Sequence, residues 1–289
     1  MSARATEDEG MTALMDGRTD DAIALLARAA DEYVTEKDDL GAMSVLANLA
    51  FLHRQHHQLP RALELTNRAL AFPVAPADSA MALVNCAGVL DHALDRRARG
   101  VWMLAAQGFT GKQPLMQVVC LAHAIGAELA QGSSSGITAA RALLAQVSLG
   151  APPAMVAGFV GAIGDSAGPH GVPFLAQAVW LMTNDATAFT GSTQAHWAQL
   201  VERIGFGAPL SLSLCVLGLG GALARKAEKD FAAVSSGVRA VFESCAKARG
   251  LDEAAFAALV QENASALESL PDALRALVPN GQWVLPLRS

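Results

Sequence analysis

Apolar residues recur along this chain at the three- and four-residue spacing of amphipathic helices, in segments separated by short polar or glycine-containing breaks. The breaks fall at Asp16 to Arg18, His57 to Pro60, Gly132 to Gly136, Gly168 to Gly171 and Gly205 to Pro209. Second helices of helix-turn-helix units are predicted to begin near Thr19, Leu59, Asp95, Ile137, Val172 and Leu210, at intervals of 35 to 42 residues. The pattern predicts about six helical hairpins.

The hairpin spacing fades after Ala227 into longer helices. These are predicted at Asp230 to Arg249, Asp252 to Leu267 and Pro271 to Leu277, before an extended tail from Pro279 to Ser289. By pattern the chain has three segments: hairpins over 1–112, charge-poor helical repeats over 113–227, and C-terminal helices with a tail over 228–289. The last helices are expected to cap the stack.

Composition favours helix over sheet. Hydrophobic residues make up 52% of the chain and aromatic residues only 5%, so the core must be built mainly from Ala, Leu and Val. Such side chains let helices pack at close distance, and Ala and Leu are strong helix formers. The predicted fold class is all-α.

Two of the second-helix segments, Asp20 to Ala29 and Pro60 to Ala69, resemble the tetratricopeptide repeat family. Small residues stand where that family's second helix touches the first, namely Ala22, Ala29, Ala62 and Ala69. The resemblance is clearest over residues 11–110 and becomes a generic helical period beyond them. It implies an α-solenoid of about six hairpins with a helical C-terminal cap. It also implies a non-enzymatic scaffold that binds a protein or peptide on its concave face, without a cofactor.

The first helices contain two matching stretches, Leu46 to Ala50 and Leu83 to Ala87, each with an asparagine at its centre. In similar tetratricopeptide proteins, an Asn at the position of Asn48 and Asn85 lines the concave surface and bonds the main chain of a bound peptide. Arg54 and His92, one to two turns further on, would share this groove and could meet a carboxylate. The alternative is that the asparagines bond an adjacent helix or are merely exposed.

Charge excludes one class of partner and suggests a second function. The net charge is -6, and the densest basic cluster is Arg96, Arg97 and Arg99, so nucleic acid is not an expected partner. Residues 113–201 contain only four charged side chains, against 26 in the first 112 residues. We expect this middle region to be covered by a partner, a second copy or the C-terminal helices. A self-associating structural subunit is therefore an alternative function.

The cysteines and the N-terminal sequence indicate the cytoplasm. Cys86, Cys120, Cys215 and Cys245 are far apart and lack a CxxC spacing, so reduced, buried thiols are expected. The acidic N-terminal sequence does not resemble a signal peptide. Ile204 to Ala224 is an uncharged run of 21 residues, but Gly and Pro interrupt it, so membrane insertion is not expected.

Two motifs suggest chemistry. His53, His56 and His57 have a spacing able to hold a transition metal, although a polar turn explains them as well and we predict no metal site. Gly164 to Gly168 matches the GxSxG nucleophile elbow and resembles the hormone-sensitive lipase family. That motif needs a preceding β-strand, whereas Ala154 to Ile163 is predicted to be helical. A serine hydrolase using Ser166 is therefore a remote alternative to an interhelical turn.

Overall fold

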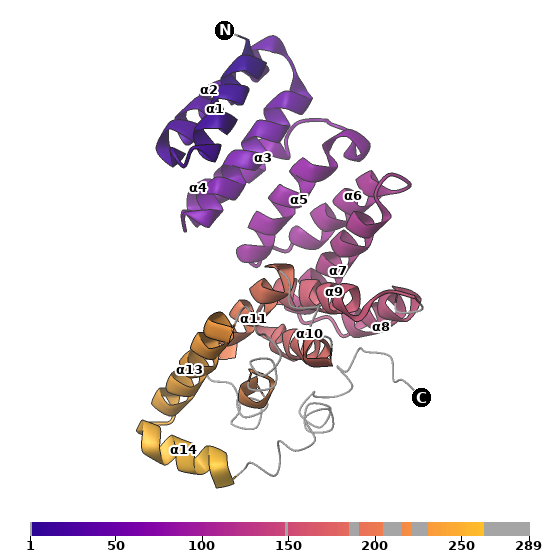
Figure 1. The fold of residues 1–289 in the computed structure, drawn as a ribbon. Helices are drawn as coiled ribbons and strands as arrows, with labels where there is room; N and C mark the ends of the chain where they lie inside the picture. The colour runs from indigo at the N-terminus through magenta and orange to yellow at the C-terminus, as the bar shows by residue number, and fades with distance from the viewer. Residues whose placement is uncertain (1, 148–149, 185–190, 205–215, 221–230, 263–289) are drawn as a thin grey trace. The chain divides into compact units, whose positions relative to one another are not determined.

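The computed structural model describes residues 2–147, 150–184, 191–204, 216–220 and 231–262, and within these ranges it contains helices and turns but no β-strand (Figure 1). The helices are α1 (Ala3–Met15), α2 (Thr19–Glu36), α3 (Asp39–Gln55), α4 (Leu59–Ala69), α5 (Pro76–His92), α6 (Ala98–Phe109), α7 (Pro114–Ala130), α8 (Ser135–Val147), α9 (Pro153–Ser166), η1 (Gly168–His170), α10 (Val172–Asn184), α11 (Gly191–Ile204), α13 (Phe231–Ala248) and α14 (Glu253–Glu262). Residues 216–220 are also helical. The predicted all-α class is confirmed.

The chain divides into two compact units, residues 1–127 and 128–289. The pattern boundary at residue 112 falls in the turn before α7. That helix nevertheless contributes Cys120, Ala124 and Ala127 to the core of the first unit. The charge-poor sequence therefore begins inside the first unit.

The predicted starts of the second helices agree with the structure at Thr19, Leu59 and Val172. The other described starts are displaced: α6 begins at Ala98 rather than near Asp95, and α8 at Ser135 rather than Ile137. Asp95 stays outside α6 because its carboxylate accepts hydrogen bonds from the backbone and side chain of Arg97. In the C-terminal segment α13 and α14 match two predicted helices. The predictions at Leu210, at Pro271 to Leu277 and for the tail lie outside the described residues.

The four helices predicted to open successive hairpins end in the same backbone conformation. A residue with positive φ follows α1, α3, α5 and α7, namely Gly17, His57, Leu94 and Gly132, at intervals of 37 to 40 residues. In each turn this residue's N–H bonds the carbonyl three residues back, and the next N–H bonds the carbonyl five residues back. This pair of bonds is the Schellman motif, which satisfies the last carbonyls of a helix and reverses the chain. The repeat is therefore present in the backbone as well as in the sequence.

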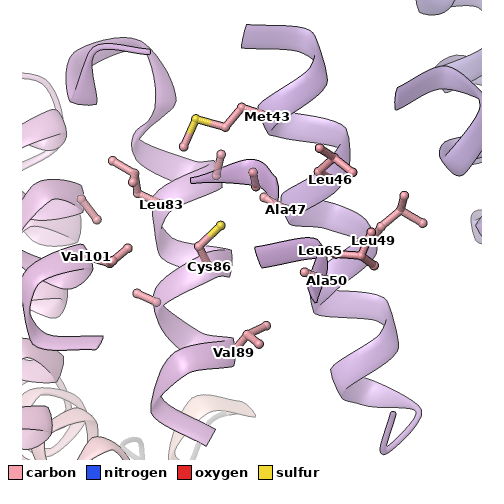
Figure 2. Close-up of a cluster of buried hydrophobic side chains, with 14 of the residues drawn as sticks. Met43, Leu46, Ala47, Leu49, Ala50, Leu65, Leu83, Cys86, Val89 and Val101 are labelled. Atoms are coloured by element: carbon pink, nitrogen blue, oxygen red, sulfur yellow. The ribbon is translucent and has the colours of Figure 1, made fainter. Parts of the chain in front are cut away.

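Small residues bring the helices of the first unit close together. Ala22, Ala29, Ala62 and Ala69, expected at the interhelical contacts, are all fully buried. The core of this unit includes Leu46 and Leu49 of α3 and Leu83 and Val89 of α5, together with the small side chains of Ala47, Ala50 and Cys86 (Figure 2). Burying a Leu or Val side chain contributes roughly 1.5 to 3 kcal/mol, so this core is a main source of stability.

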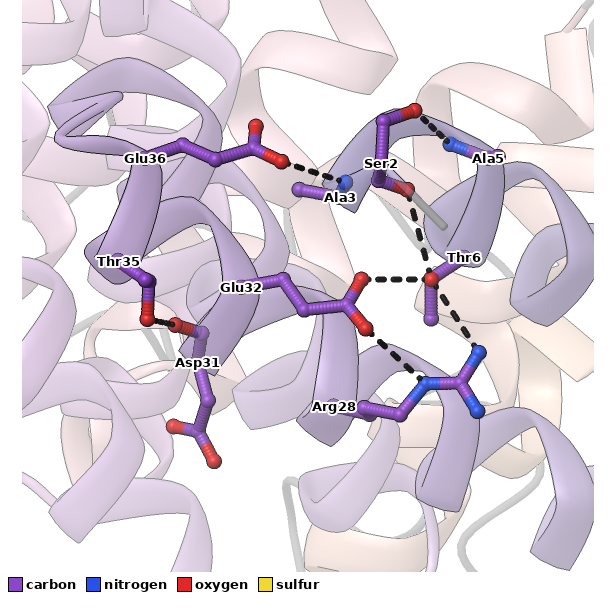
Figure 3. Close-up of polar contacts among 9 residues, drawn as sticks. All are labelled: Ser2, Ala3, Ala5, Thr6, Arg28, Asp31, Glu32, Thr35 and Glu36. Carbon is purple, nitrogen blue, oxygen red and sulfur yellow. Dashed lines mark hydrogen bonds and ion pairs between the residues drawn. The ribbon is translucent and has the colours of Figure 1, made fainter.

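A polar network ties α1 to α2 in the first hairpin (Figure 3). The fully buried Thr6 hydroxyl donates to Glu32 over 2.6 Å and accepts from Arg28 over 3.2 Å. The N–H of Ala3, in the first turn of α1, donates to the Glu36 carboxylate over 3.0 Å. Carboxylates at a helix N-terminus are stabilising because its N–H groups lack intrahelical partners. The opening helix is therefore fixed by hydrogen bonds as well as by packing.

The charge-poor helices of the second unit bury one another. In α10 six consecutive residues, 174–179, are buried, and α10 packs against both α9 and α11. The expected cover was a partner, a second copy or the C-terminal helices, whereas α9 and α10 pack against each other and against α11. Within the part of the chain that the structure describes, no helix is long and apolar enough to cross a bilayer. Most of the uncharged run from Ile204 to Ala224 lies outside the described residues.

Two glycines of α6 should respond oppositely to alanine. A Cβ on Gly108 would lie 2.2 Å from the backbone oxygen of Pro76, whereas nothing lies within 4 Å of a Cβ on Gly100. We predict that Gly108→Ala destabilises the first unit by about 1 to 3 kcal/mol through overpacking. Gly100→Ala should stabilise it by about 0.5 to 1 kcal/mol through helix propensity. Urea unfolding followed by circular dichroism measures both, and equal midpoints would contradict the close approach.

The turn after α5 should be improved by glycine. Leu94 has a φ of 53° and is 50% exposed, so its backbone is strained while its side chain is only half-buried. A left-handed conformation costs an L-residue roughly 1 to 2 kcal/mol, part of which glycine loses again in unfolded-state entropy. We predict that Leu94→Gly raises the free energy of unfolding by about 0.5 to 1 kcal/mol relative to Leu94→Ala. A glycine variant no more stable than the alanine variant would refute the strain.

Candidate functional site

The two asparagines predicted on the first helices lie directly beside each other. Asn85 Nδ2 on α5 donates a hydrogen bond of 2.9 Å to Asn48 Oδ1 on α3. Both side chains are half-buried. The sequence predicts that each asparagine binds a ligand independently, whereas in the structure they bond each other. One polar group of each amide is therefore used in this hydrogen bond.

Each amide also has a polar group that takes no part in this hydrogen bond. The N–H groups of Asn48 Nδ2 and the oxygen of Asn85 have no hydrogen bond to any other described residue. Neither Asn48 Nδ2 nor the side-chain oxygen of Asn85 is a buried atom that lacks a hydrogen-bond partner. If both amides are turned over, the bond runs in the opposite direction and the same two kinds of group remain. The pair therefore offers the NH2 group of Asn48 as a donor and the oxygen of Asn85 as an acceptor, from two helices that pack against each other.

Arg54 lies across the same junction between α3 and α5. Its Nη1 donates to the Gly88 carbonyl on α5 over 3.1 Å, and its guanidinium lies 5.0 Å from the centre of the Phe51 ring. A Cβ on Gly88 would come within 3.2 Å of Nη1, so glycine permits this approach. Burial lowers the pKa of Arg54, and the nearby Asp91 charge acts in the opposite direction.

Eight residues at equivalent positions of α3 and α5 form one surface, which we call the amide surface. They follow the i, i+4, i+7, i+11 spacing of one helix face and none is buried. They are Ser44, Asn48, Phe51 and Gln55 on α3, and Met81, Asn85, Gly88 and His92 on α5. No acidic, lysine or arginine side chain belongs to this set, and the guanidinium of Arg54 enters it at Gly88. His92, the last residue of α5, is exposed at the end of the surface.

Behind the amide surface, a group that the sequence did not reveal links three helices. Trp102 Nε1 on α6 donates to Asp91 Oδ2 on α5 over 2.6 Å. The Trp102 ring stacks on His123 of α7 with 4.4 Å between centroids and an interplanar angle of 11°. Asp91 is thus held towards α6, although it lies close enough to Arg54 to act on its charge. The only sequence feature that points to Trp102 is the scarcity of aromatic residues in this chain.

The histidine cluster occupies the turn between α3 and α4. His53 Nδ1 lies 2.5 Å from Gln58 Oε1, and His57 is the positive-φ residue of the turn. Across the described residues, no group of three or more His, Cys, Asp or Glu side chains is arranged to hold a metal ion. These contacts are those of a polar turn.

The GxSxG segment ends a helix. Ser166 is the last residue of α9, is 3% exposed, and is followed by η1. His196 of α11 places Nδ1 3.1 Å from Asp165. A Cβ on Gly161 would lie 2.3 Å from His196 Nε2, so that nitrogen faces the α9 backbone. Arg203 donates to the carbonyls of Gly164, Asp165 and Gly168 around the turn.

No protein-family model matches the chain, and no curated protein sequence matches it significantly. The resemblance to tetratricopeptide repeats therefore depends on the residues of this chain alone, and with it the functional role of Asn48, Asn85, Arg54 and His92.

The bond between the two asparagines should appear as thermodynamic coupling. We predict that Asn48→Ala and Asn85→Ala together destabilise the first unit by less than the sum of the single changes. The difference should be about 0.5 to 1.5 kcal/mol, the net contribution of one hydrogen bond. Urea unfolding of the four proteins in the cycle measures it. The exposed Gln55 supplies the control, because Gln55→Ala should be additive with Asn85→Ala, and additive effects of the two asparagines would show that the bond does not form.

Proposed function

We propose that this protein is a non-enzymatic scaffold that binds an extended peptide segment of a protein partner on the amide surface. Its fold is proposed to be an α-solenoid of tetratricopeptide-type hairpins with a helical C-terminal cap. Support comes from the Schellman turns that end α1, α3, α5 and α7, and from the fully buried alanines at the expected contacts. Stacked hairpins present a preformed surface, so a peptide can bind without reorganisation of the chain.

The single observation that carries this proposal is the Asn48–Asn85 pair. A peptide group of an extended chain needs one donor and one acceptor, and the pair retains an N–H on Asn48 and a carbonyl oxygen on Asn85. The mutual bond holds both amides in place before a ligand arrives, which reduces the entropy lost on binding. Exposed Met81 and half-buried Phe51 flank the pair and provide apolar contact for peptide side chains.

The two alternatives have less support. Self-association was suggested by the charge-poor middle of the chain, but α9 and α10 are covered by helices of their own unit. Hydrolysis by Ser166 requires a base directed at its hydroxyl, and His196 Nε2 faces Gly161 instead. Light scattering after size-exclusion chromatography tests the first alternative, and an esterase assay of Ser166→Ala tests the second.

A cytoplasmic location belongs to this proposal. The described cysteines, Cys86, Cys120 and Cys245, are buried free thiols. Burial raises the pKa of Cys86 to about 12 and that of Cys120 to about 11, so both thiols stay protonated near neutral pH. They behave as small apolar side chains, which suits a reducing compartment.

The experiment that tests the proposal is affinity capture from native lysate with the wild-type protein and with Asn48→Ala/Asn85→Ala. We predict a stoichiometric protein partner whose affinity for the double variant is lower by about ten- to a hundredfold, since two hydrogen bonds are lost. Mass spectrometry identifies the partner, and titration with the purified partner gives the affinities. Asn67→Ala is the matched control, because Asn67 is exposed on α4 and accepts a bond from Arg97.

Two results would reject the proposal. The first is a partner that binds the double variant and the wild type equally well. The second is loss of the partner together with loss of the helical signal at the assay temperature, because the asparagines would then act only in folding.

A further inference from the structure

A second contact joins α3 and α5 beyond the asparagine pair. Arg54 Nη1 of α3 donates to the Gly88 carbonyl of α5 over 3.1 Å. Arg54 lies six residues after Asn48, and Gly88 lies three residues after Asn85. At 1.5 Å per residue the contact is about 9 Å further along α3 and about 4.5 Å further along α5. The arginine side chain spans the difference, because side chains of a helix lean back towards its N-terminus.

The glycine at position 88 is explained by this contact. A Cβ there would lie 3.2 Å from Arg54 Nη1 and 3.9 Å from Arg54 Cζ. Apart from the backbone of its own helix, no other described atom lies within 4 Å of that Cβ. Glycine inside a helix is less stable than alanine, so it needs a cause, and here the cause is Arg54. Gly88 therefore keeps open the path of the arginine to the α5 backbone.

The surroundings of Arg54 direct it to this carbonyl. Its guanidinium carbon lies 5.0 Å from the centre of the Phe51 ring, three residues earlier on α3. No carboxylate among the described residues lies within ion-pair distance of Arg54. The carboxylate of Asp91, which acts on its charge, accepts the Trp102 indole N–H instead. Within the described parts of the chain, the Gly88 carbonyl is therefore the acceptor that fixes the guanidinium.

Two contacts at different heights restrict the rotation of α5 about its own axis. Side-chain atoms lie about 5 Å from a helix axis, so a rotation of about 20° moves them by about 1.7 Å. This displacement exceeds the spread of hydrogen-bond lengths and would break the 2.9 Å bond from Asn85 to Asn48. The amide pair therefore depends on a fixed rotation of α5.

We propose that Arg54 is a positioning residue of the amide surface, which acts through the Gly88 carbonyl to hold Asn85 of α5 in reach of Asn48. This inference rests on the proposed peptide-binding function, because the joined amides are the groups that the peptide meets. It gives Arg54 a role other than the carboxylate contact that the sequence suggested, since the arginine acts through α5.

The first measurement needs no ligand. Nuclear magnetic resonance on the full-length protein follows solvent exchange of the side-chain amide protons of Asn48 and Asn85, at a temperature well below unfolding. We expect Arg54→Met to speed exchange of the bonded amide about two- to tenfold, which corresponds to the loss of one hydrogen bond. Arg54→Lys should restore part of the protection, because lysine keeps a donor for the Gly88 carbonyl. A loss of global stability does not imitate this result, because the amides are read in the folded state.

Arg61→Met is the matched control for this measurement. Arg61 is exposed on α4 and pairs with Glu64, so its substitution removes the same charge from the first unit without touching α5. Exchange of both asparagine amides should be unchanged.

A double variant tests whether the glycine acts through the arginine. Gly88→Ala should raise the urea midpoint more in Arg54→Met than in the wild type, because the new methyl group then crowds no guanidinium. Gly100→Ala of α6 is the control, since nothing lies within 4 Å of its Cβ, and it should raise the midpoint equally in both backgrounds.

The last measurement extends the effect to ligand binding. The probe is a linear peptide with blocked termini and no charged residue, selected from a synthetic library on the wild-type protein and dependent on Asn48 and Asn85. Such a peptide offers no carboxylate to an arginine. We expect calorimetry to show that Arg54→Met binds it about two- to tenfold more weakly than the wild type, and that Arg61→Met binds it equally well.

Three outcomes overturn the inference and leave the proposed function standing. These are unchanged amide exchange in Arg54→Met, an equal effect of Gly88→Ala in both backgrounds, and enrichment only from a second library that contains acidic residues. If neither library yields a peptide whose binding depends on Asn48 and Asn85, the peptide-binding function fails and this inference falls with it.

Discussion

The close approach of α3 and α5 is the constraint on which the candidate site depends. Ala47, Ala50, Cys86 and Ala87 are fully buried between and around these helices, and their small size sets the distance. At that distance Asn85 donates a hydrogen bond of 2.9 Å to Asn48, and Arg54 of α3 donates to the Gly88 carbonyl of α5. A bulkier side chain in this layer would separate the axes, and both contacts would be lost together. The packing of the core therefore determines which polar groups meet at the amide surface.

The turns fix the register in which the two helices meet. Each Schellman turn stops the first helix at a defined residue, so positions counted back from His57 and from Leu94 are equivalent. Asn48 and Asn85 lie the same number of residues before their turns. Because a helix rotates about 100° per residue, an error of one residue would move an amide off its face. The positive φ at Leu94 is accompanied by the two turn hydrogen bonds, from the Leu94 N–H to Asp91 and from the Asp95 N–H to Leu90, which offset part of its cost.

Much of this could be predicted from the sequence, because hairpin spacing and helix faces are local properties. The breaks at Gly17 and His57 located two turns, and the recurrence of asparagine indicated a shared face. The side-chain contacts across a helix interface could not be predicted in this way. Whether Asn48 meets Asn85, or Arg54 meets Gly88, depends on the axial distance and on the path of a long side chain, and neither leaves a periodic signal. For the same reason the stack of Trp102 on His123 was missed.

The two units use their polar side chains differently, and this difference supports the proposed site in the first unit. In the second unit, Arg203 donates to three backbone carbonyls and His196 Nε2 is directed at Gly161, while the buried His196 Nδ1 and Asp165 Oδ1 have no hydrogen-bond partner among the described residues. A catalytic site would instead leave a nucleophile and a base converging on open space. In the first unit, donors of Asn48 and Arg54 and an acceptor of Asn85 remain unused on one accessible face. Unused groups held rigid by their neighbours lose little entropy on meeting a ligand, which is the arrangement that binding requires.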